Sequence, residues 1–474
     1  VAETKVADAT LPNAGPAGDK PAGDKTLVTG SIGGKAAREP AVTGSIAVPP
    51  RDGAALAGLS MPANSDMRAI SEEVADHPDV LAAREREAAS GDEIRKARAA
   101  YLPSLSLDSA VGIDRIVQGN GKGDPDLNPY SYGVKAELTV FDGFQRRHKL
   151  MRAKADRDAT VAATRDTVQQ TLVDAVTLLA QSVRDKAILD HRRAYMKRLD
   201  AVMRETRARK REGDASDTDV QQVRTRIEAA NSSIRLAEGS LAETDAQLRR
   251  YLTSLKLSAL QLKDLARALP PSREAAAREA LDNNPMLERA NMRAEAAEEE
   301  RLAARGAMMP RVAVVGEVKS EGEQYENDKH NTDLQVGLQL SMPIFTGGSR
   351  IADMSQKKHE AHAARHEADS ARRLVVAGVD GAWGRLEEND KALISSQARI
   401  AAARRALKGV EASHDIDESS TLDVLNAHQE VMTAEIEREE FLYTGVVTRH
   451  LLLAQVGRLD DVYGLRDQGK MASR

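Results

Sequence analysis

Residues 333–348 read DLQVGLQLSMPIFTGG and carry the clearest structural signal of the chain. Every second residue from Leu334 to Met342 is apolar, and the residues between them are Gln, Gly, Gln and Ser. This alternation predicts a β-strand with one apolar and one polar face. Pro343 and the pair Gly347-Gly348 end the strand, and about seventy Ala-rich and charge-rich residues follow, which predict a long helix.

The same order of features occurs earlier in the chain. Residues 130–144 read YSYGVKAELTVFDGF, alternate from Tyr132 to Val140 and lead into another long helical segment. Two further strands are predicted where LPSLSL begins at residue 102 and MPRVAV begins at residue 309. Met309 follows Leu102 by 207 residues and Phe345 follows Phe141 by 204. Landmarks in constant order at a nearly constant offset indicate an internal duplication.

These patterns divide the chain into three parts. Residues 1–65 contain short repeats and many Gly and Pro, which predicts a disordered N-terminal extension. They contain no apolar leader, so we expect that a signal peptide has been removed or that the given start is not the true one. The first structural repeat is predicted at 66–270, with strands at about 104–117 and 130–141 and long helices at about 145–210 and 216–255. The second is predicted at 271–474, with strands at about 311–320 and 333–345 and long helices at about 348–412 and 420–457.

The composition excludes several classes of protein. Charged residues make up 30% of the chain and aromatic residues only 3%, which favours long helices and coiled coils over a compact core. A net charge of -5 gives no reason to expect nucleic-acid binding. The chain has no cysteine, which excludes disulfides, Cys-bound metals and a lipid-modified N-terminal Cys. No run of ~18 apolar residues predicts a transmembrane helix.

The four predicted strands raise the question of what covers their apolar faces. Strands of about ten residues can cross a bilayer when tilted, but the smallest membrane barrel needs about eight strands. If these strands lie in a membrane, several chains must therefore contribute to one barrel. The alternative is a small soluble sheet with one buried face, and the alternation alone favours neither. Seven of the thirteen aromatic residues lie in or beside the strand regions, as interfacial girdles require: Tyr101, Tyr130, Tyr132, Phe141, Phe144, Tyr325 and Phe345.

The duplicated order of helix, two strands, long helix and returning helix resembles the TolC family of outer-membrane channel proteins. SMPIFTGG at 341–348 is the most specific match, and TVFDGF at 139–144 is its weaker partner. SDTDVQQVR from residue 216 and STLDVLNAHQEV from residue 420 resemble the helices that return from the periplasmic tips. The resemblance covers about residues 66–460. It implies a mainly α fold with a membrane β-barrel portion, in which three chains form a twelve-stranded barrel and a twelve-helix tunnel.

No group of residues is typical of an enzyme. His359, His362 and His366 share one helix face, but HEAHAARH does not match the HExxH pattern of zinc proteases. Histidines on the surface of a helix explain them better. We therefore expect no catalytic residue, no cofactor and no metal site.

The most informative polar residues lie where the long helices break. Ser216 with Asp219, and Ser420 with Asp423, predict capping boxes at the start of the returning helices. This local role is compatible with a second one, because threefold symmetry would bring three Asp423 carboxylates towards the axis and select cations.

The resemblance implies a role for each residue near these breaks. Asp423 matches the first aspartate of the family's periplasmic constriction, and Asn426 stands at the second, so the ring would carry half the usual charge. Asp219, beside Thr218, matches the aspartate of a lock between helices. Ser419 and His414 stand where the family has an arginine and a tyrosine, so we expect the arginine bridge to be missing. His414 adds a group that can titrate near neutral pH. The tips that would contact an adaptor are predicted to include Gly213, Asp214, Asp217, Asp417 and Glu418.

The resemblance implies a passive export duct in the bacterial outer membrane that extends into the periplasm. Its partners would be two further copies of itself, outer-membrane lipid, a periplasmic membrane-fusion adaptor and an ABC-type pump of the inner membrane. The acidic tips and the missing anchor cysteine favour type I protein secretion, with a toxin of the RTX kind, such as an adenylate cyclase-haemolysin, as cargo. The alternatives are a multidrug efflux channel that exports small molecules and, from another class, a soluble coiled-coil scaffold.

Overall fold

The structure is a computed structural model that describes residues 64–115, 126–253, 265, 268–322 and 330–465. Almost all of the extension predicted at 1–65 lies outside the described residues. The described helices are α1 Asn64–Ala75, α2 Pro78–Ala99, α3 Gln145–Glu212, α4 Asp217–Leu248, α5 Arg273–Asn283, α6 Pro285–Gly306, α7 Ser349–Asp415, α8 Thr421–Val456 and α9 Leu459–Val462. The described strands are β1 Ser104–Val111, β2 Asp114–Arg115, β3 Asp126–Leu127, β4 Tyr130–Phe141, β5 Arg311–Gly322 and β6 His330–Ser341.

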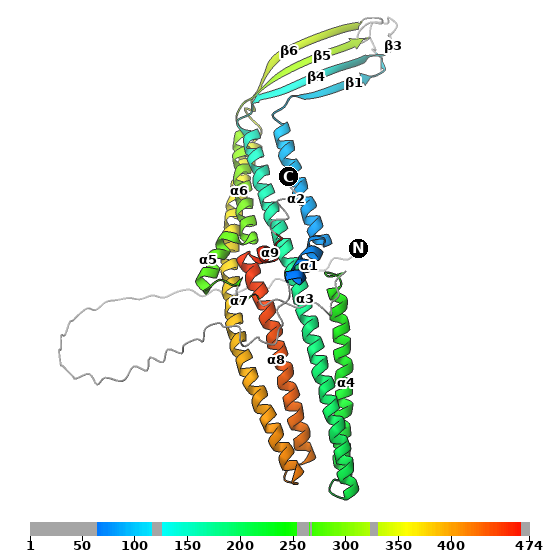
Figure 1. The fold of residues 1–474 in the computed structure, drawn as a ribbon. Coiled ribbons are helices and arrows are strands. Elements are labelled where there is room, and N and C mark those ends of the chain that lie inside the picture. Colours follow the sequence, from blue (N-terminus) through cyan, green and yellow to red (C-terminus); the bar gives the residue numbers. More distant parts are fainter. Residues whose placement is uncertain (1–63, 116–125, 254–264, 266–267, 323–329, 466–474) are drawn as a thin grey trace, which may run out of the picture. The chain divides into compact units, whose positions relative to one another are not determined.

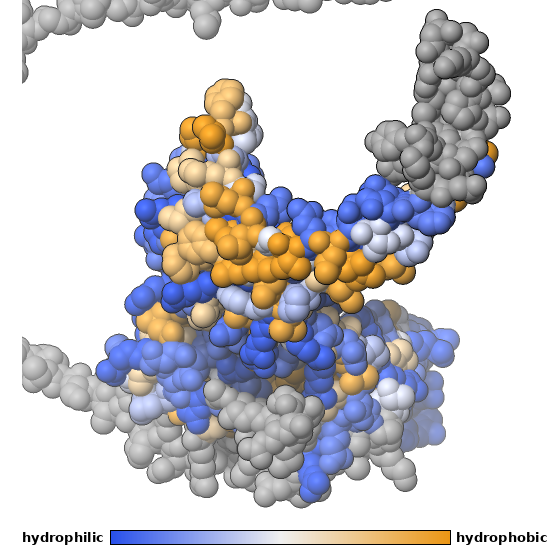
Figure 2. Space-filling view, turned by 90° about the horizontal axis from the view of Figure 1, so that it is seen from above, coloured by the Kyte–Doolittle hydropathy of each residue, from blue (hydrophilic) through white to orange (hydrophobic). Residues whose placement is uncertain are grey.

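Four strands form one antiparallel sheet in the order β1-β4-β5-β6 (Figure 1). Its register aligns apolar residues across all four strands, since Leu107 pairs with Val134, Val134 with Val318, and Val318 with Leu334. The side chains of Leu107 and Leu334 are each 75% exposed. Figure 2 shows the apolar residues as a continuous band across this part of the molecule. The sheet therefore presents an uncovered apolar face.

A β-bulge changes the alternation that the sequence predicts for β4. The register shifts between Thr139 and Phe141, so that Phe141 pairs with Val312. Val140 is the extra residue of this bulge: it has no partner on β5, and it is 58% exposed. The shift continues the apolar face with the larger ring of Phe141 at the end of the strand next to the helices.

The long helices follow directly from the sheet (Figure 1). α3 follows β4 and α7 follows β6, and they contain 68 and 67 residues. At ~1.5 Å per residue each helix extends about 100 Å away from the strands. α3 packs against α2, α4, α6 and α8, and α7 packs against α6 and α8. Among the helices that the structure describes, none combines the length and apolar character that crossing a bilayer requires.

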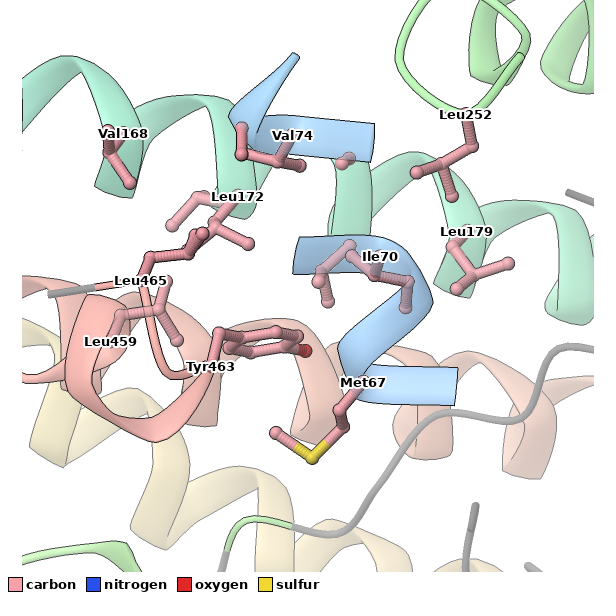
Figure 3. Close-up of a cluster of buried hydrophobic side chains, with 14 of the residues drawn as sticks. Met67, Ile70, Val74, Val168, Leu172, Leu179, Leu252, Leu459, Tyr463 and Leu465 are labelled. Atoms are coloured by element: carbon pink, nitrogen blue, oxygen red, sulfur yellow. The ribbon is translucent and has the colours of Figure 1, made fainter. Parts of the chain in front are cut away.

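Buried apolar clusters fix how these helices pack. In the cluster of Figure 3, Ile70 and Val74 of α1 and Leu172 of α3 lie with Leu459 and Tyr463 near the end of the described chain. A second cluster holds α3, α4 and α8 together near the ends of the long helices. Its fully buried members include Leu199, Val223 and Leu425. This second cluster supports the two helix turns that the sequence singles out.

Candidate functional site

Two turns connect the long helices to the helices that return. The first turn, residues 213–216, joins α3 to α4, and the second turn, residues 416–420, joins α7 to α8. Gly213 ends α3 with a φ of 95°, and Asp417 lies in the second turn with a φ of 61°. Aspartate is one of the few residues other than glycine that visit this left-handed region. Both helices therefore end at a residue suited to reversing the chain.

Both predicted capping boxes are confirmed. Asp219 accepts hydrogen bonds from the backbone nitrogen and hydroxyl of Ser216 at 2.9 and 2.7 Å, and its own nitrogen donates to the Ser216 hydroxyl at 3.2 Å. Asp423 and Ser420 repeat this pattern at 3.0, 2.6 and 3.2 Å. These serine hydrogen bonds lower the pKa of both carboxyl groups. Asp423 is therefore held ionised on an exposed surface at the start of α8.

His414 is buried between the two turns, with 7% of its surface exposed. Its Nδ1 lies 2.7 Å from the backbone oxygen of Ser419, and its Nε2 lies 3.2 Å from Nη1 of Arg209. A carbonyl oxygen can only accept and a guanidinium can only donate. The neighbours therefore assign the neutral tautomer that carries hydrogen on Nδ1.

Arg209 links the two turns. Its Nη1 also donates to the backbone oxygen of His414 at 3.0 Å, and its Nη2 pairs with the carboxylate of Asp417. This contact is not the arginine bridge that the resemblance implies, because position 419 holds serine and the absence of that bridge stays a prediction. The arginine of the contact seen here comes from the opposite hairpin, and the sequence analysis did not predict it. The only signal in the sequence that could have indicated Arg209 is its place in the last turn of α3, where the helix dipole favours cations.

A second arginine engages the predicted constriction residue Asn426. Arg226 of α4 donates from Nη2 to the side-chain oxygen of Asn426 at 3.0 Å. Its Nη1 donates to the side-chain oxygen of Gln429 at 2.6 Å. Sequence reasoning missed Arg226 and Gln429, because nothing local to either residue indicates a partner about 200 positions away.

The remaining predicted residues lie around the turns without joining this network. The nitrogens of Gly213 and Asp214 donate to the oxygens of Lys210 and Arg209, which closes the end of α3. Asp217 pairs with Lys210 at 2.6 Å. Thr218 lies in the first turn of α4, and Glu418 donates its backbone nitrogen to Ser413 at 2.8 Å.

A polar layer between α3, α7 and α8 lies further from the turns. Glu435, which is buried, lies 3.2 Å from Nδ1 of His191 and 2.7 Å from Arg404. His428, also on α8 and buried, has its Nε2 3.5 Å from Glu411 of α7 and faces Arg198 of α3. Both histidines therefore lie near a carboxylate, but His428 is more deeply buried and also lies in the field of Arg198.

This layer predicts a stability that depends on pH. The hydrogen bond to Glu439, with the nearby charge of Glu435, raises the pKa of His191. A raised pKa means that protonated His191 stabilises the fold at low pH and that this contribution is lost as pH rises through the raised pKa. We expect His191→Gln to lower the free energy of unfolding by about 0.5–1 kcal/mol near pH 5 and by little near pH 8. Urea unfolding at the two pH values measures this difference.

His428 provides the control of opposite sign. Burial, and secondarily Arg198, lower the pKa of His428, so its neutral form is favoured in the fold and stability is lost as pH falls through the lowered pKa. His428→Gln should therefore reduce the acid-induced loss of stability that His191→Gln increases. Equal changes of the unfolding free energy with pH in the two variants would contradict the opposite pKa directions assigned to His191 and His428.

The described residues include no cluster typical of a metal site, and they border a cavity. Within the described part of the chain, no three His, Cys, Asp or Glu residues are placed to hold a metal ion. A cavity of about 830 Å³ lies where the strands meet the long helices. Two ion pairs lie on its wall, Arg146 with Asp142 at 2.9 Å and Arg311 with Glu137 at 2.6 Å.

Comparison with known proteins agrees with this architecture. The profile of the family described as "Outer membrane efflux protein" matches residues 69–254 and 276–449, which is more than half of the chain. The chain is 26% identical over 377 residues to the outer membrane efflux protein BepC of Brucella suis, covering 79% of this chain and 81% of that protein. It is also 26% identical over 386 residues to the alkaline protease secretion protein AprF of Pseudomonas aeruginosa, covering 77% and 78%.

The fold has close counterparts among solved structures. The outer-membrane channel OprN superposes with a TM-score of 0.74 at 17% sequence identity, covering 83% of this chain and 90% of that chain. That structure supports the fold alone, and the family follows from the sequence profile. The match extends over both predicted repeats and over the helices that carry both turns. The chain therefore belongs to the outer membrane efflux protein family, whose members are channel proteins of the bacterial outer membrane rather than enzymes.

Proposed function

We propose that three copies of this protein form the exit duct of a tripartite exporter, which conducts its cargo passively across the periplasm and the outer membrane. The observation that carries the proposal is the four-stranded sheet, with its uncovered apolar face and the two free edges of β1 and β6. A sheet with open edges is not stable in lipid, so its edges must pair.

The topology allows three sheets to close into one barrel. Successive strands in the order β1-β4-β5-β6 are antiparallel, so β1 and β6 run in opposite directions. β6 of one chain can therefore pair with β1 of the next and continue the antiparallel pattern. Three chains give twelve strands, which exceeds the minimum of about eight for a membrane barrel.

The length of the apolar face suits an outer membrane. From Tyr132 to Phe141 the strand β4 rises about 30 Å, at ~3.3 Å per residue. A tilt of about 40° reduces this to roughly 23 Å, close to the ~25 Å apolar band of such barrels. Tyr132 lies near one end of the face, and Phe141, in edge contact with Phe144, lies at the other. Tyr325, also predicted for a girdle, lies outside the described residues.

The proposed partners are a periplasmic adaptor and an ABC-type pump of the inner membrane that supplies the energy. We place protein export by type I secretion first. The name of AprF records protease secretion, and the second turn exposes the acidic pair Asp417 and Glu418. Efflux of small molecules is the second candidate, since BepC, of equal identity, is named as an efflux protein. Deleting the gene separates these roles: lost protein export supports the first, and drug sensitivity with intact export supports the second.

Planar-bilayer recording tests whether the protein is a channel at all. Detergent-purified protein should be trimeric and should produce discrete, cation-selective conductance steps. A monomer that stays soluble without detergent and shows no conductance would support the soluble scaffold instead. The exposed apolar face already argues against that alternative, because a soluble sheet would have to bury it.

The two capping boxes allow a matched test of the constriction. Asp423→Ala should lower the cation-to-anion permeability ratio by about fivefold, as expected for about 1 kcal/mol between an ion and a carboxylate ring in a wet pore. Asp219→Ala removes the same serine hydrogen bonds from the other returning helix and serves as the control. If both variants change the ratio equally, or neither does, Asp423 does not line the constriction.

A further inference from the structure

We propose that the two turns are held together in this chain by a clasp of inverted charge. The first hairpin, α3 and α4, supplies the cations Arg209 and Arg226, and the second hairpin, α7 and α8, supplies all of their acceptors. The family resemblance implied the opposite arrangement, with an aspartate on the first hairpin and an arginine on the second. The claim that the clasp controls conduction rests on the proposed function. The claim that the clasp holds the two turns together does not.

The acid of the first hairpin is already committed elsewhere. The carboxylate oxygen Oδ2 of Asp219 accepts from both the nitrogen and the hydroxyl of Ser216. Ser419 contributes its backbone oxygen, which accepts from His414. Asp219 and Ser419, two of the three positions that the resemblance assigns to the lock, therefore serve the local structure of their own hairpins.

Arg209 forms the stronger half of the clasp. Its side chain is only 19% exposed, and its guanidinium reaches a carboxylate, a ring nitrogen and a backbone oxygen of the second hairpin. Hydrogen bonds made by a charged group in partly desolvated surroundings are stronger than those between neutral groups. His414, buried under this guanidinium, is held in one tautomer and orients Ser419. Arg209 therefore positions the whole second turn.

Arg226 forms the other half from the second helix of the same hairpin. Asn426 and Gln429 lie three residues apart and so share one face of α8, which matches the fork of a guanidinium. The clasp thus holds the second hairpin from both α3 and α4. Separating the hairpins requires breaking the contacts of both arginines together.

The absence of cysteine allows a direct measurement of the clasp. Spin labels on cysteines introduced at Asp214 and Glu418, both exposed, report the separation of the turns in the full-length protein. Arg209→Ala should increase the separated population at least about tenfold, since it removes several hydrogen bonds of a charged group. Arg211→Ala, an exposed residue in the same helical turn, is the matched control and should leave the distances unchanged.

A double-mutant cycle assigns the effect to the named contact. Asp417→Asn removes the charge but keeps a residue that tolerates a positive φ. Its effect on the separated population should be largely absent when Arg209 is already alanine, because interacting residues are not additive. Additive effects, or distances in Arg209→Ala equal to those of the parent, would overturn the clasp.

Conductance distinguishes failure of the clasp from failure of the proposed function. If the turns separate in Arg209→Ala and channel conductance rises with them, both inferences hold. If the turns separate but no variant conducts, the clasp stands and the duct is wrong. If channels form and Arg209→Ala changes neither distance nor conductance, the duct stands and the clasp is wrong.

Discussion

Leu338→Arg is expected to abolish assembly of the protein in the outer membrane. Leu338 lies in the middle of β6, is 76% exposed and pairs with Val314, which pairs with Leu138. An arginine at the midplane of a lipid-facing barrel strand costs about 2–4 kcal/mol. In a trimer this cost is incurred once per chain, so three copies cost about 6–12 kcal/mol, which is comparable with the ~5–15 kcal/mol stability typical of a folded protein.

The neighbouring residue provides the control for this prediction. Gln339→Arg adds the same charge one position along, where the side chain points to the opposite, polar face. Size-exclusion chromatography of detergent-extracted outer membranes should show a trimer for Gln339→Arg and none for Leu338→Arg. Equal trimer yields would mean that the apolar face does not meet lipid, and the proposed barrel would have to be abandoned.

Most of the fold prediction rests on the period of the apolar residues and on the residues that cap the helices. Alternation in residues 333–342 is a local property, and so are the Ser-x-x-Asp patterns at Ser216 and Ser420, which form capping boxes as expected. Such signals need only neighbouring residues. The bulge beside Phe141 was missed because it depends on pairing with β5, which lies about 170 residues away along the chain.

The sequence predicts where the candidate site lies along the chain, but not which of its side chains are in contact. The helix breaks identify where the turns lie, and the duplication relates positions in the two halves, but neither determines which side chains meet. Arg209 and His414 are 205 positions apart, and their contact depends on how the two hairpins pack, chiefly α3 against α8. The burial of His414 follows from the same packing, which no local pattern in the sequence indicates.

Gly457→Ala is expected to have the second large effect, on stability rather than on assembly in lipid. Gly457 follows α8 with a φ of 80°, and a Cβ there would lie 2.3 Å from the backbone oxygen of Asn283. That contact cannot be relieved by rotating a side chain. The nearby Asn284 caps α6 and donates to the backbone of Gln455 at 2.7 Å, so displacing this backbone also disturbs the junction between the start of α6 and the end of α8.

Gly464→Ala is the control that separates the cost of the steric clash from the cost of the left-handed backbone conformation. Gly464 has a φ of 70°, but a Cβ there meets nothing within 4 Å. Gly464→Ala should cost about 1–2 kcal/mol through the left-handed conformation alone, and Gly457→Ala about 3–5 kcal/mol. The single tryptophan, Trp383, lies in the buried cluster that contains Val456, so its fluorescence during urea unfolding reports on this joint. Equal midpoints for the two variants would show that the backbone near Asn283 yields freely, and the close approach would then contribute nothing to holding the start of α6 against the end of α8.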